Sequence, residues 1–175
     1  MKTEKTTRVR SVTADICLNG LLVALVLAAT MFINIRLPIS VNGGLIHLGN
    51  VPLVAAAIVF GRRKGAIAGA FGMGLFDLLS GWTLWAPFTF VVRGAMGWVI
   101  GKISETRGGK SFVANLLAVT VGGAIMVAGY YVTEVILYGN FVAPVTSIPG
   151  NLIQVLTALV IGLPLSTALK KTGIV

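Results

Sequence analysis

Long apolar stretches, separated by short polar or glycine-rich connections, dominate this chain of 175 residues. A stretch of about 20 apolar residues is long enough to cross the hydrocarbon core of a membrane as an α-helix. Charged residues, glycine and proline interrupt the pattern and mark where the stretches end. The pattern predicts six membrane-spanning helices at about residues 16–34, 50–61, 65–81, 86–103, 112–138 and 150–169.

The second predicted span is the shortest. Twelve residues at 50–61 extend only about 18 Å as an α-helix, whereas the hydrocarbon core is roughly 30 Å thick. This helix should therefore either include residues 45–49 or lie partly inside the bundle.

Composition places the chain among the integral membrane proteins. Hydrophobic residues make up 56% of it and charged residues 11%, and its mean hydropathy is +0.94. A soluble domain is usually about 25% charged. We expect a single membrane domain over residues 1–175, with a basic cytoplasmic segment at 1–15 and an all-α bundle of six helices at 16–170.

The start of the chain, MKTEKTTRVRSVTAD, is polar and basic, and the apolar run behind it is long enough to span a membrane. It therefore differs from a cleavable signal peptide, and we expect the first span to stay in the mature protein. The single cysteine, Cys17, excludes a disulfide within the chain.

Lysine and arginine gather in alternate connections between the predicted spans. Cytoplasmic loops of membrane proteins collect these residues, so their distribution predicts the orientation of the bundle. The connections at 35–49, 81–86 and 139–149 hold only Arg36 and should face outward, which places both termini in the cytoplasm. The residues that indicate the inner side are Lys2, Lys5, Arg8, Arg10, Arg62, Arg63, Lys64, Lys102, Arg107, Lys110, Lys170 and Lys171.

The same asymmetry explains the formal net charge of +9. Aromatic residues lie within the spans and do not alternate with the basic runs, which is unlike a nucleic-acid-binding surface. We therefore expect the basic rim to face the lipid bilayer and expect no nucleic-acid partner.

The sequence shows no catalytic or metal-binding motif. The stretch RGGKS at 107–111 resembles the end of a phosphate-binding loop, but Ser104 stands where that motif requires glycine, and no strand precedes it. His47 is the single histidine, and neither an HExxH, a paired-cysteine nor a GxSxG pattern occurs. We expect no enzyme activity, no ATPase site, no metal and no cofactor.

Small residues recur at four-residue spacing in several spans. Such pairs form a flat helix face that lets two backbones approach closely inside a membrane. Helix packing within the bundle is the expected role of Gly65 with Gly69, Ala70 with Gly74, and Gly97 with Gly101.

Three charged residues interrupt otherwise apolar spans. Counted from the outer ends, Asp77 lies about four residues into the third span, Arg93 about six into the fourth and Glu134 about five into the fifth. All three should lie at a similar depth in the outer third of the membrane. Because a charge at the bilayer centre costs roughly 2.5–3.5 kcal/mol, each should face the bundle or a watery cavity.

Further polar groups should join this layer. Asn151 and Gln154 are three residues apart and Tyr130 and Glu134 are four apart, so each pair shares a helix face. The charges could lock helices through an Asp77–Arg93 ion pair, but the additional polarity favours a site for a small, flat, polar ring. The candidate residues are Asp77, Arg93, Tyr130, Tyr131, Glu134, Asn151 and Gln154, with Trp82 and Trp85 either covering the site or forming an interfacial belt.

Four stretches resemble one family of transport proteins. They are ALVLA at 24–28, HLGNVP at 47–52, FGRRKGA at 60–66 and GAFGMGLFDLLSG at 69–81. These stretches resemble the substrate-binding S components of energy-coupling factor (ECF) vitamin transporters, in the group related to riboflavin, hydroxymethylpyrimidine and pyridoxine carriers. Chain length, six spans and inward-facing termini extend the resemblance over nearly the whole chain.

The resemblance implies a multi-pass protein of the bacterial cytoplasmic membrane that binds a vitamin from outside. It implies docking on an ECF transmembrane coupling protein driven by two cytoplasmic ATPase subunits, with Ala24 and Ala28 packed against the coupling protein. It also implies a vitamin held near the outer surface between the last three helices and capped by outer loops. Residues at the first loop therefore join the candidate set, namely Asn42, His47 and Asn50.

The substrate and two other functions stay open. A pyrimidine or pyridine vitamin or precursor is favoured, with hydroxymethylpyrimidine ahead of pyridoxine and riboflavin behind both, because carboxylates accept hydrogen bonds from ring amino or hydroxyl groups. A stand-alone secondary transporter usually shows two similar halves, which spans 1–3 and 4–6 do not. A membrane enzyme or a helper subunit without substrate ranks third, since no workable catalytic set occurs.

Overall fold

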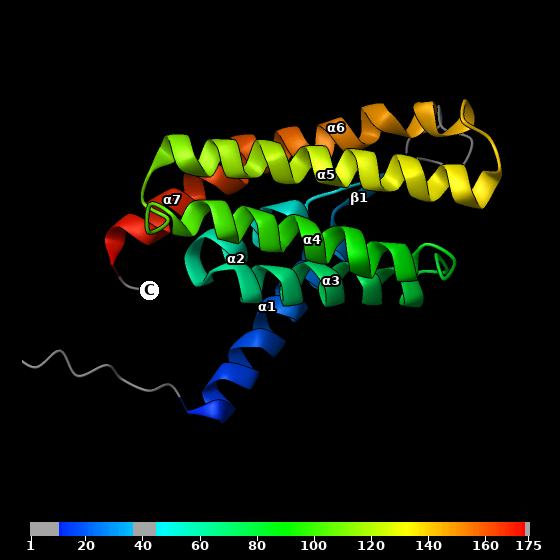
Figure 1. Cartoon of the computed structure of the whole chain (residues 1–175). Helices are drawn as coiled ribbons and strands as arrows, with labels where there is room; N and C mark the ends of the chain where they lie inside the picture. Colours follow the sequence, from blue (N-terminus) through cyan, green and yellow to red (C-terminus); the bar gives the residue numbers. More distant parts are fainter. Residues whose placement is uncertain (1–10, 37–44, 174–175) are drawn as a thin grey trace, which may run out of the picture.

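The computed structural model describes residues 11–36 and 45–173, which form a bundle of helices with one small hairpin of strands (Figure 1). Helices α3, α4, α5 and α6 run side by side, and α2 lies among them. The α-helices are α1 (Val12–Phe32), α2 (Asn50–Phe60), α3 (Arg62–Leu79), α4 (Ala86–Glu105), α5 (Phe112–Tyr138), α6 (Ile148–Thr157) and α7 (Leu163–Thr172). A 3-10 helix, η1 (Ala143–Ser147), precedes α6, and a π-helical turn, η2 (Ala158–Gly162), joins α6 to α7.

The six apolar stretches of the sequence correspond to these helices, with ends that differ by four residues or fewer. The sixth stretch is built from α6, η2 and α7 in succession. Three of the helical segments are long and apolar enough to cross a membrane, namely Val12–Phe32, Phe112–Tyr138 and Ala143–Thr172. The molecule is a helical, multi-pass membrane protein. The full set of six spans and the cytoplasmic termini remain predictions.

Helix α2 lies inside the bundle. Its 11 residues extend only about 16 Å, and contacts with α1, α3, α4 and α7 surround it. Leu53, Val54 and Ala57 have no exposed surface. The sequence allowed this stretch either to include residues 45–49 or to lie partly inside the bundle. The structure shows the second arrangement, because residues 45–47 form a strand instead of extending the helix.

Helices α3 and α4 approach each other through glycine. A Cβ atom on Gly97 would overlap the carbonyl oxygen of Gly65, and one on Gly101 would overlap the Cα atom of Arg62. At the start of α3, Gly61 has a φ of 91°, which favours glycine, and the Glu105 carboxylate accepts from the Arg62 backbone N–H at 2.8 Å. The two helices therefore meet backbone to backbone over the first turns of α3 and the last turns of α4.

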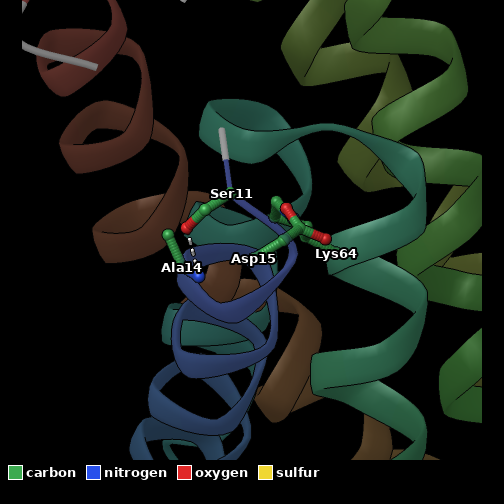
Figure 2. A network of polar contacts seen from close by, with 4 residues as sticks. All are labelled: Ser11, Ala14, Asp15 and Lys64. Atoms are coloured by element: carbon green, nitrogen blue, oxygen red, sulfur yellow. Dashed lines mark hydrogen bonds and ion pairs between the residues drawn. The ribbon is translucent and has the colours of Figure 1, made fainter. Parts of the chain in front are cut away.

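Helix α1 leaves the other helices at a steep angle (Figure 1) and buries one narrow face, formed by Leu22, Val26 and Thr30. Its first turn is capped by the Ser11 hydroxyl, which accepts from the Ala14 N–H at 3.2 Å. Figure 2 shows this cap beside the ion pair between Asp15 and Lys64 of α3, whose side-chain atoms are 2.5 Å apart. Most of the remaining apolar surface of α1 is exposed.

The connection between α1 and α2 contains an antiparallel hairpin of β1 (Asn34–Arg36) and β2 (Leu45–His47), which the sequence pattern did not predict. Asn34 pairs with His47 and Arg36 with Leu45. Strand β2 also contacts α6 and α1. Asn42 lies between the two strands, outside the described residues, so the prediction that it belongs to the site stays a prediction.

Candidate ligand-binding site

A cavity of about 80 Å³ lies where the hairpin meets α3, α4, α5 and α6. One buried water needs roughly 10–15 Å³ by the comparable measure, so this space is large enough for a small ligand. Charged, amide, hydroxyl and aromatic side chains face it together. The lining residues are Leu45, His47, Asp77, Trp82, Trp85, Thr89, Arg93, Tyr130, Glu134, Tyr138, Ser147, Asn151 and Gln154.

Nine of the residues named from the sequence line this cavity. They are His47, Asp77, Trp82, Trp85, Arg93, Tyr130, Glu134, Asn151 and Gln154. Four further lining residues, Leu45, Thr89, Tyr138 and Ser147, were not named. Helical spacing could have found two of them, because Thr89 lies four residues before Arg93 and Tyr138 lies four residues after Glu134. Leu45 and Ser147 lie in connections between the predicted spans and carry no such signal.

Two of the named residues lie elsewhere. The Tyr131 hydroxyl donates to the Phe141 carbonyl at 3.0 Å, and its side chain borders an apolar groove between α5 and α6 instead of the cavity. Tyr131 follows Tyr130 directly, so the two side chains point to different sides of α5. Asn50 is fully buried beneath the cavity, where its side chain contacts Arg93.

Arg93 is only 1% exposed and joins three helices through its guanidinium group. Nε donates to the Tyr130 hydroxyl on α5 at 3.0 Å, Nη1 to Asn50 Oδ1 on α2 at 2.5 Å, and Nη2 to Gln154 Oε1 on α6 at 2.9 Å. The Gln154 amide nitrogen in turn donates to the Leu45 carbonyl of β2. Arg93 thus holds the helices and, through Gln154, the hairpin around the cavity.

The direct partners of this buried cation are neutral. Among the residues that the structure describes, the ion pairs within 4.0 Å join Arg62 to Glu105 and Asp15 to Lys64, both away from the cavity. The direct Asp77–Arg93 ion pair considered from the sequence is therefore not formed. Hydrogen bonds to a charged group contribute about 1.5–3 kcal/mol each, which allows three neutral acceptors to offset much of the desolvation of a guanidinium group.

His47 lies at the end of β2 with its ring buried against Phe76, the ring centroids being 6.4 Å apart. The Gly49 N–H donates to His47 Nδ1 at 3.2 Å, so Nδ1 acts as an acceptor and the neutral ring carries its hydrogen on Nε2. Burial lowers the pKa of His47 well below its usual range, and the nearby Arg93 charge lowers it further. The cavity therefore contains a neutral imidazole.

Aromatic rings form one side of the cavity. Trp82 and Trp85 meet edge to face with centroids 5.3 Å apart, and Trp85 meets Tyr138 at 6.1 Å. The Arg93 guanidinium lies 5.0 Å from the centroid of the Tyr130 ring. Such surfaces stack on a flat ring. The alternative role for the two tryptophans was an interfacial belt. In the structure both face the cavity.

The polar groups of the cavity suit the binding of a small molecule. Two carboxylates, Asp77 and Glu134, and the amides of Asn151 and Gln154 supply acceptors and donors around its edge. The described part of the chain contains no cluster of three or more residues suited to hold a metal ion. Aromatic walls with a few convergent polar groups are typical of sites for small organic molecules.

The fold and the cavity together define a multi-pass helical membrane protein with a site for a small polar molecule. The sequence model for the S component of ECF-type riboflavin transporters matches residues 10–171. The chain therefore belongs to this family, which confirms the resemblance found in the sequence.

Two relatives extend this comparison. A protein of Pyrococcus woesei, described as an uncharacterized protein in the gap 3' region, is 33% identical over 137 residues, which cover 78% of this chain and 90% of the relative. The thiamine precursor transporter HmpT of Lactococcus lactis subsp. cremoris is 28% identical over 132 residues, which cover 75% of this chain and 74% of that protein.

Proposed function

We propose that this chain is the substrate-binding subunit of an ATP-driven ECF transporter that takes up a pyrimidine or pyridine vitamin or precursor. In this proposal the chain binds its substrate from outside and has no ATPase site of its own. It then docks on a transmembrane coupling protein that two cytoplasmic ATPase subunits drive. The observation that carries the proposal is the polar, partly aromatic cavity of about 80 Å³ in a member of the S-component family.

The cavity supports a substrate with a single ring. Its rings can stack on a flat molecule, while carboxylates, amides and the neutral His47 surround the edge. Riboflavin carries three fused rings and a sugar-like chain, which fits a cavity of this volume poorly. The relative HmpT is named as a thiamine precursor transporter. Hydroxymethylpyrimidine, a precursor of thiamine, is therefore our first candidate, ahead of pyridoxine.

Helix α1 supports the proposed docking surface. Ala24 is exposed and Ala28 is half-buried, and exposed apolar side chains surround them, including Leu21 and Leu25. Two alanines at four-residue spacing leave room for another helix to approach closely. The coupling protein is the proposed occupant of this face.

The proposal is tested in two steps. The protein is purified in detergent, any released ligand is identified by mass spectrometry, and hydroxymethylpyrimidine, pyridoxine and riboflavin are then titrated by calorimetry. We expect the pyrimidine to bind most tightly. Uptake of the bound compound is next measured in cells with and without the partner ATPase subunits, and it should stop without them.

Three results would contradict the proposal. Uptake that continues without the ATPases would identify a stand-alone secondary transporter. Tighter binding of riboflavin than of either single-ring compound would overturn the substrate class. A purified, folded protein that binds none of the three compounds and releases no ligand would contradict the binding role itself.

A further inference from the structure

One oxygen of the Glu134 carboxylate is buried without a hydrogen-bond partner among the described residues. Its side chain reaches the cavity from α5, the residue is only 8% exposed, and its Oε2 atom accepts no hydrogen bond from the described residues. The Ser147 hydroxyl, at the start of α6, lies beside the same carboxylate. Buried carboxylate oxygens are almost always hydrogen-bonded, so Oε2 is the natural place for a donor that arrives with the ligand.

Asp77, the other carboxylate of the cavity, lies next to hydroxyl groups. Arg93 Nε donates to the Tyr130 hydroxyl at 3.0 Å, and the oxygen of Tyr130 lies 3.1 Å from Thr89 Oγ1. The Thr89 side chain lies beside Asp77 as well. Two hydroxyl groups, those of Tyr130 and Thr89, thus separate the Arg93 guanidinium from the Asp77 carboxylate.

No second cation is available for Glu134 among the residues that line the cavity. The other donors of Arg93 are directed to Asn50, Gln154 and the sulfur of Met126, which lies 2.7 Å from Nη1. His47 is neutral, since its Nδ1 accepts from Gly49. The lining holds two carboxylates, Asp77 and Glu134, and one cation, Arg93, so it has one carboxylate in excess, and a ligand that presents N–H groups would balance it.

We propose that Glu134 Oε2 binds the exocyclic amino group of an aminopyrimidine and is the residue that selects this ligand over single rings lacking an amino group. This inference rests on the proposed function and names the ligand feature that the site detects. The amino N–H donates to Oε2, while Tyr138, four residues further along α5, and Trp85 offer ring surfaces beside it. Arg93 then acts as a positioning residue that holds the cavity together.

The test varies the ligand and the protein together. Hydroxymethylpyrimidine and its analogue with hydrogen in place of the amino group are titrated by calorimetry into the wild type, Glu134→Gln and Glu134→Leu. In the wild type the amino compound should bind about ten- to a hundredfold more tightly, which corresponds to one charge-assisted hydrogen bond. Glu134→Leu should bring this ratio close to one, and Glu134→Gln, a neutral acceptor, should give an intermediate ratio.

Glu105→Gln provides a matched control, because it makes the same change at an acidic residue on the far end of α4. It should leave the ratio of the two affinities as it is in the wild type. Thermal melts of every variant record folding separately. If Glu134→Leu does not fold, the two ligands on the wild type and Glu134→Gln still decide the question.

The possible failures are distinguishable. Equal binding of the two compounds to the wild type would overturn the role of Glu134 but leave the proposed function intact. An unchanged ratio in Glu134→Gln and Glu134→Leu, with lowered melting temperatures, would also overturn that role, since Glu134 would then be a structural residue. Failure of the wild type to bind any single-ring compound would overturn both proposals.

Discussion

A single arginine shows how this chain accommodates charge within an apolar bundle. From the sequence, Arg93 needed a partner, and Asp77 at a similar depth was an evident one. In the structure the guanidinium instead bonds to Asn50, Tyr130 and Gln154. Because Arg93 donates its hydrogen bonds to neutral acceptors, the carboxylates of the cavity stay available to bind a ligand.

The protonation of His47 is a second property at the residue scale that can be tested. Its pKa lies well below the usual value of 6.5, so the unfolded chain binds a proton more readily than the folded protein does. The stabilisation from the neutral ring is complete above about pH 6.5 and decreases as the pH falls from there toward the folded-state pKa. The decrease approaches about 1.4 kcal/mol for each pH unit in that interval.

We therefore predict that the melting temperature of the wild type falls between about pH 7.5 and pH 5.5, where histidine titrates. His47→Gln, which does not titrate, should show a smaller fall over the same interval. His47 is the single histidine of the chain, so the difference between the two melting curves isolates it. Parallel curves would show that burial does not control its protonation.

At the scale of elements, glycine determines how closely α3 and α4 pack. The four-residue spacing of small residues predicted close helix contacts, and the α3–α4 pair shows them at Gly65, Gly97 and Gly101. These contacts bring the two helices together at the end of the bundle away from the cavity. Close contact continues toward the cavity, where a Cβ atom on Gly69 would overlap the Arg93 carbonyl oxygen.

Gly97→Ala should destabilise the protein, because the added methyl group would overlap the Gly65 carbonyl oxygen, and overpacking of this kind costs about 1–3 kcal/mol. The measurement is a thermal melt in detergent. Gly20→Ala is the control, since a Cβ atom there would meet nothing within 4 Å. A melting temperature for Gly97→Ala equal to that of the wild type would mean that the α3–α4 contact is looser than described.

Helix α1 is the element that carries the proposed docking face. Ala24→Leu should abolish uptake in cells that contain the partner subunits, because a large side chain keeps the two helices apart. Vitamin binding to the purified protein should be unchanged, since Ala24 is exposed and does not line the cavity. Ala95→Leu, the same change at an exposed position of α4, should leave uptake intact. Normal uptake by Ala24→Leu would exclude this face as the interface.

At the scale of the whole molecule, the basic residues at the helix ends and the cavity lie at opposite ends of the bundle. The basic residues Arg62, Lys64 and Lys102 lie at the end where α3 begins and α4 ends, and Asp77 and Trp85 lie at the other end. Positive residues collect on the cytoplasmic side, so the cavity is predicted to open outward. An uptake subunit requires this orientation.

Cysteine labelling tests the orientation. With Cys17 replaced by alanine, a cysteine at Arg63 should react with an impermeant maleimide only after the cells are opened, and a cysteine at Leu84 should react in intact cells. Both positions are exposed, so the reagent can reach them once it is on the correct side. The reverse pattern would place the cavity in the cytoplasm and contradict uptake from outside.

Sequence alone determined the membrane class, the extent of the helices and the common level of three charged residues along them. Hydropathy and helix-breaking residues act over a few neighbouring positions, so the fifth span was predicted at 112–138 and is found at Phe112–Tyr138. Helical rise then gave Asp77, Arg93 and Glu134 a common depth, and all three line one cavity.

Only the tertiary structure decided which groups meet. Asn50 and Arg93 are 43 residues apart, and the Gln154 amide reaches a carbonyl 109 residues away, so no local pattern could pair them. The hairpin β1–β2 was missed because its strands are only three residues long and because β2 packs against α6, which is distant in the sequence. Tyr130 and Tyr131 are equivalent in the sequence, and the rotation of α5 against its neighbours sends one hydroxyl to Arg93 and the other to Phe141.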